Sequence, residues 1–238
     1  MLKGDATHPI DTTGGLRPRP GLFLLLSALF AATAGLATFG APLDEEADAP
    51  AILTFSKTLK GSVPEYLQIT VDSNGSGAYE GRKLDDPPHP RPLQLSPALA
   101  RRLFTLAAQL GYFRSIEHES HRKVANLGLK TLTYQERGRV GRVEFNYTQN
   151  RFAQELLGLL EKIANVEQHV ASLEYSLKYD PLNLPKALLD IQAELDNKDL
   201  VAPELMVPTL ERIIQNPRVL HLAQTRAENI LQRIQTSN

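Results

Sequence analysis

The chain between residues 151 and 178 has the sequence RFAQELLGLLEKIANVEQHVASLEYSLK, which carries the clearest structural pattern of the whole sequence. Its apolar residues alternate spacings of four and three, a 3.5-residue repeat typical of a coiled-coil seam or a bundle helix. A helix of this length spans about 42 Å at 1.5 Å per residue. Its first half can lie on a small sheet, whereas its second half needs another partner. The residues of the repeat are Phe152, Leu156, Leu159, Ile163, Val166, Val170, Leu173 and Leu177.

The C-terminal region offers partners for that second half. Asp180-Pro181 ends the long helix, and apolar residues spaced by three and four recur as far as residue 234. We therefore predict a helical region over residues 150–238, in which shorter amphipathic helices and the long one form a bundle. The recurring residues are Leu184, Leu188, Ile191 and Leu195, then Leu210, Ile213 and Ile214, then Leu220, Ala223, Ala227, Ile230 and Ile234.

A second copy of the chain, or another protein, is the alternative partner for the long helix. A regular seam over several heptads is also what a two-stranded coiled coil requires. Leu160 lies beside the seam and widens the apolar stripe. The wider stripe favours a bundle within one chain over self-association.

Residues 51–149 alternate apolar and polar side chains in several short runs, as strands do. Strands are predicted at 52–55, 66–71 and 78–82, with Asn74-Gly75 making the hairpin turn between the last two. Two more are predicted at 130–135 and 140–147. Ser96-Pro97 begins a helix whose apolar stripe ends at Gly111. The sequence thus predicts an α+β fold with a small, mostly antiparallel sheet covered by a helix.

A proline-rich segment interrupts this pattern at residues 85–92, with the sequence DDPPHPRP. Its prolines lack donors and favour an extended polyproline conformation, so the segment is neither helix nor inner strand. It is a ligand for an aromatic groove or, as its surroundings favour, a stiff connector at the surface.

Composition excludes several classes of function. The 238-residue chain has 26 basic and 27 acidic side chains, so no global field draws it onto nucleic acid. It contains no cysteine, which excludes disulfides, thiolate metal sites and cysteine nucleophiles. It contains no tryptophan, so a Trp-lined ligand platform is absent as well.

The N-terminal region points to the membrane. A polar leader of residues 1–20 precedes residues 21–41, which carry no charge, and an acidic linker follows at 42–50. An uncharged helix of that length matches a bilayer core of about 30 Å. With Arg17 and Arg19 held in the cytoplasm, the rest of the chain would lie outside it. The stretch is either an uncleaved anchor or a cleaved signal peptide; a buried core helix is the less favoured alternative.

The densest polar cluster is Glu117-His118-Glu119-Ser120-His121. His118 and His121 could share a helical face and bind a metal, with Glu117 or His89 completing the site. The spacing differs from the zincin motif, whose histidines stand four apart, and the stretch follows a helix stop. A solvated loop is therefore the favoured interpretation. The sequence predicts no catalytic residues and no cofactor, since it has neither a serine elbow nor a phosphate loop.

A family resemblance rests on Ile69-Thr70-Val71, on Tyr79-Glu80-Gly81-Arg82 with the preceding Gly75 and Gly77, and on Leu103 followed by Gly111-Tyr112-Phe113. Together these resemble a recurring domain of unknown function in bacterial secreted proteins, over roughly residues 55 to 150. The resemblance implies a compact α+β fold and a location in the cell envelope. It implies no catalytic residue.

These observations together predict an exported or membrane-anchored bacterial envelope protein. It would be anchored in the inner membrane facing the periplasm, or secreted to the periplasm after cleavage. We expect a non-enzymatic binding or scaffolding module, with the membrane as a partner through residues 21–41 and no nucleic-acid partner. The alternative is a metal-dependent hydrolase that uses the loop from Glu117 to His121.

Overall fold

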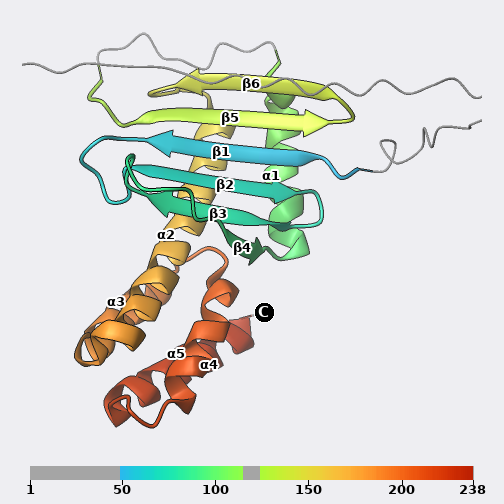
Figure 1. Cartoon of the computed structure of the whole chain (residues 1–238). Coiled ribbons are helices and arrows are strands. Elements are labelled where there is room, and N and C mark those ends of the chain that lie inside the picture. The colour runs from blue at the N-terminus through green and yellow to red at the C-terminus, as the bar shows by residue number, and fades with distance from the viewer. Residues whose placement is uncertain (1–48, 115–123, 238) are drawn as a thin grey trace, which may run out of the picture. The chain divides into compact units, whose positions relative to one another are not determined.

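The computed structural model describes residues 49–114 and 124–237, which form an α+β fold with a six-stranded antiparallel sheet and five α-helices (Figure 1). The long helix predicted from the apolar repeat is among them. The elements are β1 Ile52–Thr58, β2 Tyr66–Asp72, β3 Ser76–Arg82, β4 Arg91–Gln94, α1 Pro97–Gln109, β5 Leu129–Glu136, β6 Arg139–Phe145, α2 Arg151–Tyr179, α3 Leu184–Asp196, α4 Val207–Gln215 and α5 His221–Ser237.

The sheet has the strand order β4-β3-β2-β1-β5-β6, and every neighbouring pair is antiparallel. The β2–β3 hairpin forms where Asn74-Gly75 predicted it. Asp72 stabilises the turn, because its carboxylate accepts the backbone N–H groups of Asn74 and Ser76 at 2.8 and 2.9 Å. Gly75 has a φ of +87°, a conformation that glycine adopts without steric cost.

The prediction of four or five strands covered by one helix is incomplete. The additional strand, β4, comes from the end of the proline-rich segment and the residues after it, and it pairs only with β3. Pro92 is tolerated in β4 because an edge strand leaves one row of backbone groups without a ladder partner. The last residues of the proline-rich segment therefore belong to an edge strand. This agrees with the prediction that the segment is not an inner strand.

Strand β6 ends at Phe145, two residues before the predicted end. The side chain of Asn146 explains the difference, because it binds the loop before β5 instead of continuing the strand. Its amide oxygen accepts the N–H of Leu127 at 2.8 Å, and its amide nitrogen donates to the carbonyl oxygen of Ala125 at 3.1 Å.

One face of the sheet is covered by α1 and α2, which lie behind the strands in Figure 1. Alternation along the strands buries one set of side chains, including Leu53, Phe55, Ile69 and Leu132. Helix α1 begins as predicted, with the Ser96 hydroxyl accepting the N–H of Leu99 at 3.4 Å. The buried stripe of α1 includes Leu103 and Leu106 and continues to Leu110 at the C-cap, whereas Arg101 and Arg102 are exposed.

Helix α2 contributes to two apolar clusters, as its length predicts. Leu156, Leu160 and Ile163 are fully buried beneath the sheet. Val170 and Leu173, further along, are buried in a second cluster with α3, α4 and α5. The second half of the seam therefore has its partner within the same chain.

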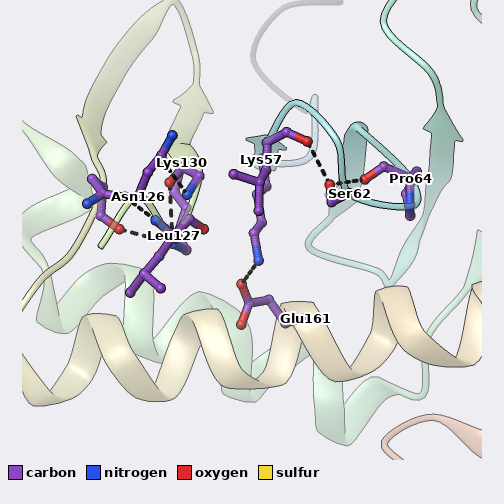
Figure 2. Close-up of polar contacts among 10 residues, drawn as sticks. Lys57, Ser62, Pro64, Asn126, Leu127, Lys130 and Glu161 are labelled. Carbon is purple, nitrogen blue, oxygen red and sulfur yellow. Dashed lines mark hydrogen bonds and ion pairs between the residues drawn. The ribbon is translucent and has the colours of Figure 1, made fainter. Parts of the chain in front are cut away.

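An ion pair adds a polar tie between the sheet and α2 (Figure 2). Lys57 Nζ of β1 lies 2.9 Å from the carboxylate of Glu161, over the first half of the helix. Nearby, the buried Lys130 donates to the carbonyl oxygens of Leu127 and Asn146 at 3.2 and 3.0 Å. Lysine is rarely buried, and here its ammonium neighbours backbone acceptors at the end of the sheet.

The predicted N-terminal hydrophobic helix, residues 21–41, lies outside the described residues. Over 49–114 and 124–237, none of the helices combines the length and the apolar character that crossing a bilayer requires.

Candidate functional site

A groove of about 920 Å³ opens where the second half of α2 passes the β3–β4 side of the sheet. Its walls come from the β1–β2 loop at Val63-Pro64, from β3, from residues just before and at the start of β4, and from the side of α2 that faces away from the seam. The volume falls in the range of about 300–1,000 Å³ that small-ligand sites occupy in proteins. This groove is our candidate site.

The loop wall is held in place by hydrogen bonds. The Ser62 hydroxyl lies 2.6 Å from the carbonyl oxygen of Pro64 (Figure 2). The Glu65 carboxylate accepts the backbone N–H groups of Gly61 and Leu84 at 2.9 and 3.2 Å, and these bonds hold the pKa of Glu65 below its usual value. The Val63 side chain, 93% exposed, is thereby presented to solvent at the groove.

The opposite wall carries two exposed tyrosines of α2. Tyr175 and Tyr179 are 63% and 62% exposed, and their ring centroids lie 5.1 Å apart. Lys178 Nζ lies 4.8 Å from the centroid of the Tyr179 ring, which is within cation–π range. Exposed tyrosines are common at binding surfaces, because a rigid ring contributes a large contact area at a small cost in conformational entropy.

Tyr79 of β3 also lines the groove, and it is only 4% exposed. Its hydroxyl lies above Gly81, where a Cβ atom would come within 2.3 Å of the phenol oxygen, so the glycine makes room for it. Within residues 49–114 and 124–237 this hydroxyl makes no hydrogen bond. Burial raises the pKa of Tyr79 to about 12, so the phenol keeps its proton well above neutral pH and can donate a hydrogen bond to a ligand.

Beside Tyr79, a network of ion pairs joins the start of β4 to α2. Arg91 lies 2.6 Å from the carboxylate of Glu167 and 3.1 Å from that of Glu174, and it donates to the backbone carbonyl of Glu167 at 2.9 Å. Arg212 of α4 binds the other oxygen of Glu174 at 2.9 Å. The Glu167 side chain is only 6% exposed, and burial raises its pKa although Arg91 lowers it in part. The guanidinium of Arg91 also lies 5.8 Å from the Tyr79 ring centroid.

The remaining polar groups of α2 in the groove bind one another or α3. His169 Nε2 lies 3.0 Å from the carboxylate of Glu194, which also accepts from the side-chain amide of Asn165 at 2.9 Å. The amide of Gln168 donates to the backbone carbonyl of Ala164 at 3.3 Å. One carboxylate oxygen of Glu194 and the amide nitrogens of Asn165 and Gln168 are therefore engaged within the chain.

The residues predicted from sequence as a metal site, Glu117, His118 and His121, lie outside the described residues. Their proposed additional ligand His89 is exposed at the mouth of the groove. In the part of the chain that the structure describes, there is no cluster of three or more side chains suited to hold a metal ion. Among the same described residues, no hydroxyl is hydrogen-bonded to an imidazole, as a nucleophile–base pair would require.

The strands and the long helix that form this groove are predicted by the sequence, but their meeting in one groove is not. Tyr79 was recognised only as a strand residue, and Arg91 as part of a connector. One signal was available, since Tyr175 and Tyr179 stand four apart on a predicted helix and both fall off the seam. Large aromatic residues on the solvent side of an amphipathic helix indicate a contact surface.

No model of a known protein family matches the chain, and a search of curated proteins finds no relative.

The ion pair between Arg91 and the buried Glu167 should contribute to the stability of the fold. We expect Arg91→Met to lower the free energy of unfolding by about 3 kcal/mol at pH 7, because a buried carboxylate loses its partner. Burial raises the pKa of Glu167, so its protonation is more favourable in the folded chain than in the unfolded one. The deficit should therefore be smallest below the ordinary carboxyl pKa of 4.5 and grow as the pH rises through the folded-state value.

Urea unfolding followed by circular dichroism at pH 4 and pH 7 measures this difference. Arg102→Met is the control, because Arg102 pairs with Glu155 at the surface, with side chains 48% and 40% exposed. Its loss should stay below about 1 kcal/mol at both pH values. An Arg91→Met deficit that does not change with pH would contradict the expectation.

The contribution of the Tyr79 hydroxyl to stability can be measured by removing it. Tyr79→Phe removes a hydroxyl that makes no hydrogen bond within the described part of the chain, so the ligand-free protein should keep its stability or gain up to about 1 kcal/mol. Tyr66→Phe is the matched control, because the Tyr66 hydroxyl donates to Gln68 at 2.6 Å and its loss should cost about 1 kcal/mol. Equilibrium unfolding in urea compares them, and a larger loss for Tyr79→Phe would show a structural role.

Proposed function

We propose that the protein is a non-enzymatic binding module of the bacterial cell envelope. Residues 21–41 would carry the remainder across the inner membrane, as an anchor facing the periplasm or as a cleaved signal peptide. The absence of charge over this stretch supports the proposal, as do Arg17 and Arg19 before it. The acidic linker that follows would separate the membrane segment from the α+β fold.

The binding role rests on the groove between the β1–β2 loop, β3 and α2. The observation that carries it is the Tyr79 hydroxyl, which is buried, protonated at neutral pH and without a partner in the described chain. Desolvating such a group costs about 1–3 kcal/mol, which a bound acceptor would recover. The exposed pair Tyr175 and Tyr179 beside it supplies the apolar contact area that a ligand would cover.

The partner is proposed to bind at this groove and not at the apolar seam of the long helix. Val166, Val170 and Leu173 of the seam are already buried within the chain's own second cluster. A second copy that used the seam would have to displace α3, α4 and α5, and with them the apolar contacts of that cluster.

Cell fractionation tests the location. A tagged full-length chain produced in a bacterium should appear in the membrane or periplasmic fraction, and mass spectrometry of its N-terminus should distinguish anchor from cleaved signal. Leu24→Arg combined with Leu26→Arg should retain it in the cytosol, because each charge opposes insertion by about 3 kcal/mol. Ile10→Arg, in the polar leader, is the control and should leave the location unchanged. Wild-type chain that is intact and dissolved in the cytosol would overturn the proposal.

Calorimetric titration tests the groove. Purified full-length protein is titrated with four probes: a blocked decaproline, a blocked Gly-Ser decapeptide, chitohexaose and oleate. We expect at least one to bind, with an affinity that falls at least about tenfold when Tyr175→Ala and Tyr179→Ala are combined. Leu222→Ala removes a side chain that is 55% exposed on α5, outside the groove, and should leave the affinity unchanged.

Two results would overturn the binding proposal. The first is that none of the four probes binds, or that binding survives loss of both tyrosines. The second is a metal that copurifies in stoichiometric amount and is lost in both His118→Ala and His121→Ala, which would favour the metal-dependent hydrolase.

A further inference from the structure

We propose that the ligand of this groove is a proline-rich peptide in the polyproline II conformation. This inference rests on the proposed binding function and adds the chemical class of the ligand. It follows from which hydrogen-bonding groups of the groove are still free, from the shape of its two walls and from its charge.

The groove offers a free donor, and its carboxylate acceptors are occupied. One carboxylate oxygen of Glu174 binds Arg91 and the other binds Arg212. A sugar, which is rich in hydroxyl donors, would have to share this carboxylate with the two arginines. A polyproline II chain presents backbone carbonyls that have no internal partner, and its prolines have no N–H to satisfy.

The Tyr79 hydroxyl is placed to use such a carbonyl. It lies beside Gly81 in the groove lining and occupies the space that a Cβ atom of residue 81 would fill. The phenol keeps its proton at neutral pH, so it donates, and a peptide carbonyl accepts.

The two walls suit proline rings. Tyr175 and Tyr179 form one wall with tilted rings at an interplanar angle of 47°, and Val63-Pro64 lies in the facing loop. Aromatic-lined grooves bind proline-rich segments because the ligand is already extended and loses little conformational entropy on binding. The exposed aromatic rings and the exposed Val63 offer the apolar surface that pyrrolidine rings cover.

The charge of the groove favours a ligand whose bound part carries no formal charge. Arg91 lies between Glu167 and Glu174, so the only guanidinium in the lining is neutralised by its own ion pairs. An anionic ligand would have to compete with these carboxylates for Arg91. The backbone and pyrrolidine rings of a proline-rich peptide carry no charge and leave the network intact.

Fluorescence polarisation of a fluorescein-labelled decaproline amide tests the proposal on the purified full-length chain. The labelled peptide should bind, whereas a labelled Gly-Ser peptide of equal length should bind at least about tenfold more weakly. Tyr179→Ala should weaken decaproline binding at least about tenfold, and Tyr79→Phe at least about fivefold, the loss of one hydrogen bond. Leu222→Ala and Tyr66→Phe, both outside the groove, should bind as the wild type does.

The outcomes separate this inference from the proposed function. If chitohexaose or oleate binds and decaproline does not, with binding lost on removal of the two α2 tyrosines, the groove is a binding site and the proline-rich ligand is wrong. Equal binding of the two labelled peptides would also overturn the proline-rich ligand. The site would then bind any peptide of that length and would not select the polyproline II conformation. If Tyr79→Phe and Tyr66→Phe lower the affinity equally, the phenol does not hold the peptide. If no probe binds, the inference and the proposed function fail together.

Discussion

The length of α2 relative to the sheet is the constraint on which the rest of the structure depends. The helix has 29 residues and is therefore about 44 Å long, whereas strands of seven or eight residues span about 25 Å. The apolar seam continues past the sheet, and leaving it exposed to water would cost about 25 cal/mol per Å². Helices α3, α4 and α5 cover that part of the seam and build the second apolar cluster.

This arrangement also creates the groove. Only part of the circumference of α2 is covered in its second half, because the sheet lies on one side and the short helices on another. The uncovered side presents Tyr175 and Tyr179 next to the β3–β4 side of the sheet. Arg91 bridges the gap by binding Glu167 and Glu174, which ties the start of β4 to the helix at the point where a ligand would enter. In the same ion-pair network, the positive charges of the two arginines balance the negative charges of the two glutamates. The network therefore contributes polar groups to the groove without adding net charge.

Three carboxylates around the groove are paired with basic side chains, which supports the proposed binding role. Catalytic carboxylates and imidazoles need free lone pairs or protons near a reacting atom, and here Glu167, Glu174 and Glu194 are bound to Arg or His within the chain. The Tyr79 phenol, whose pKa burial raises to about 12, makes no hydrogen bond within the described residues. In the proposed role it would donate a hydrogen bond to a bound molecule.

Local patterns in the sequence determined most of the fold. The β2–β3 hairpin, the start of α1 at Ser96, and the extent of α2 follow from turn chemistry, capping and a 3.5-residue repeat, which act between residues close in the chain. The membrane segment predicted at residues 21–41 likewise depends only on the local absence of charged side chains. Tertiary packing alone places β4 at one edge of the sheet and brings Tyr79, Arg91, Glu174 and Tyr175 together in one groove. Pairs such as Arg91 and Glu167 stand far apart in the chain, and no local period encodes their contact; it arises because the sheet and the long helix pack together to remove apolar surface from water.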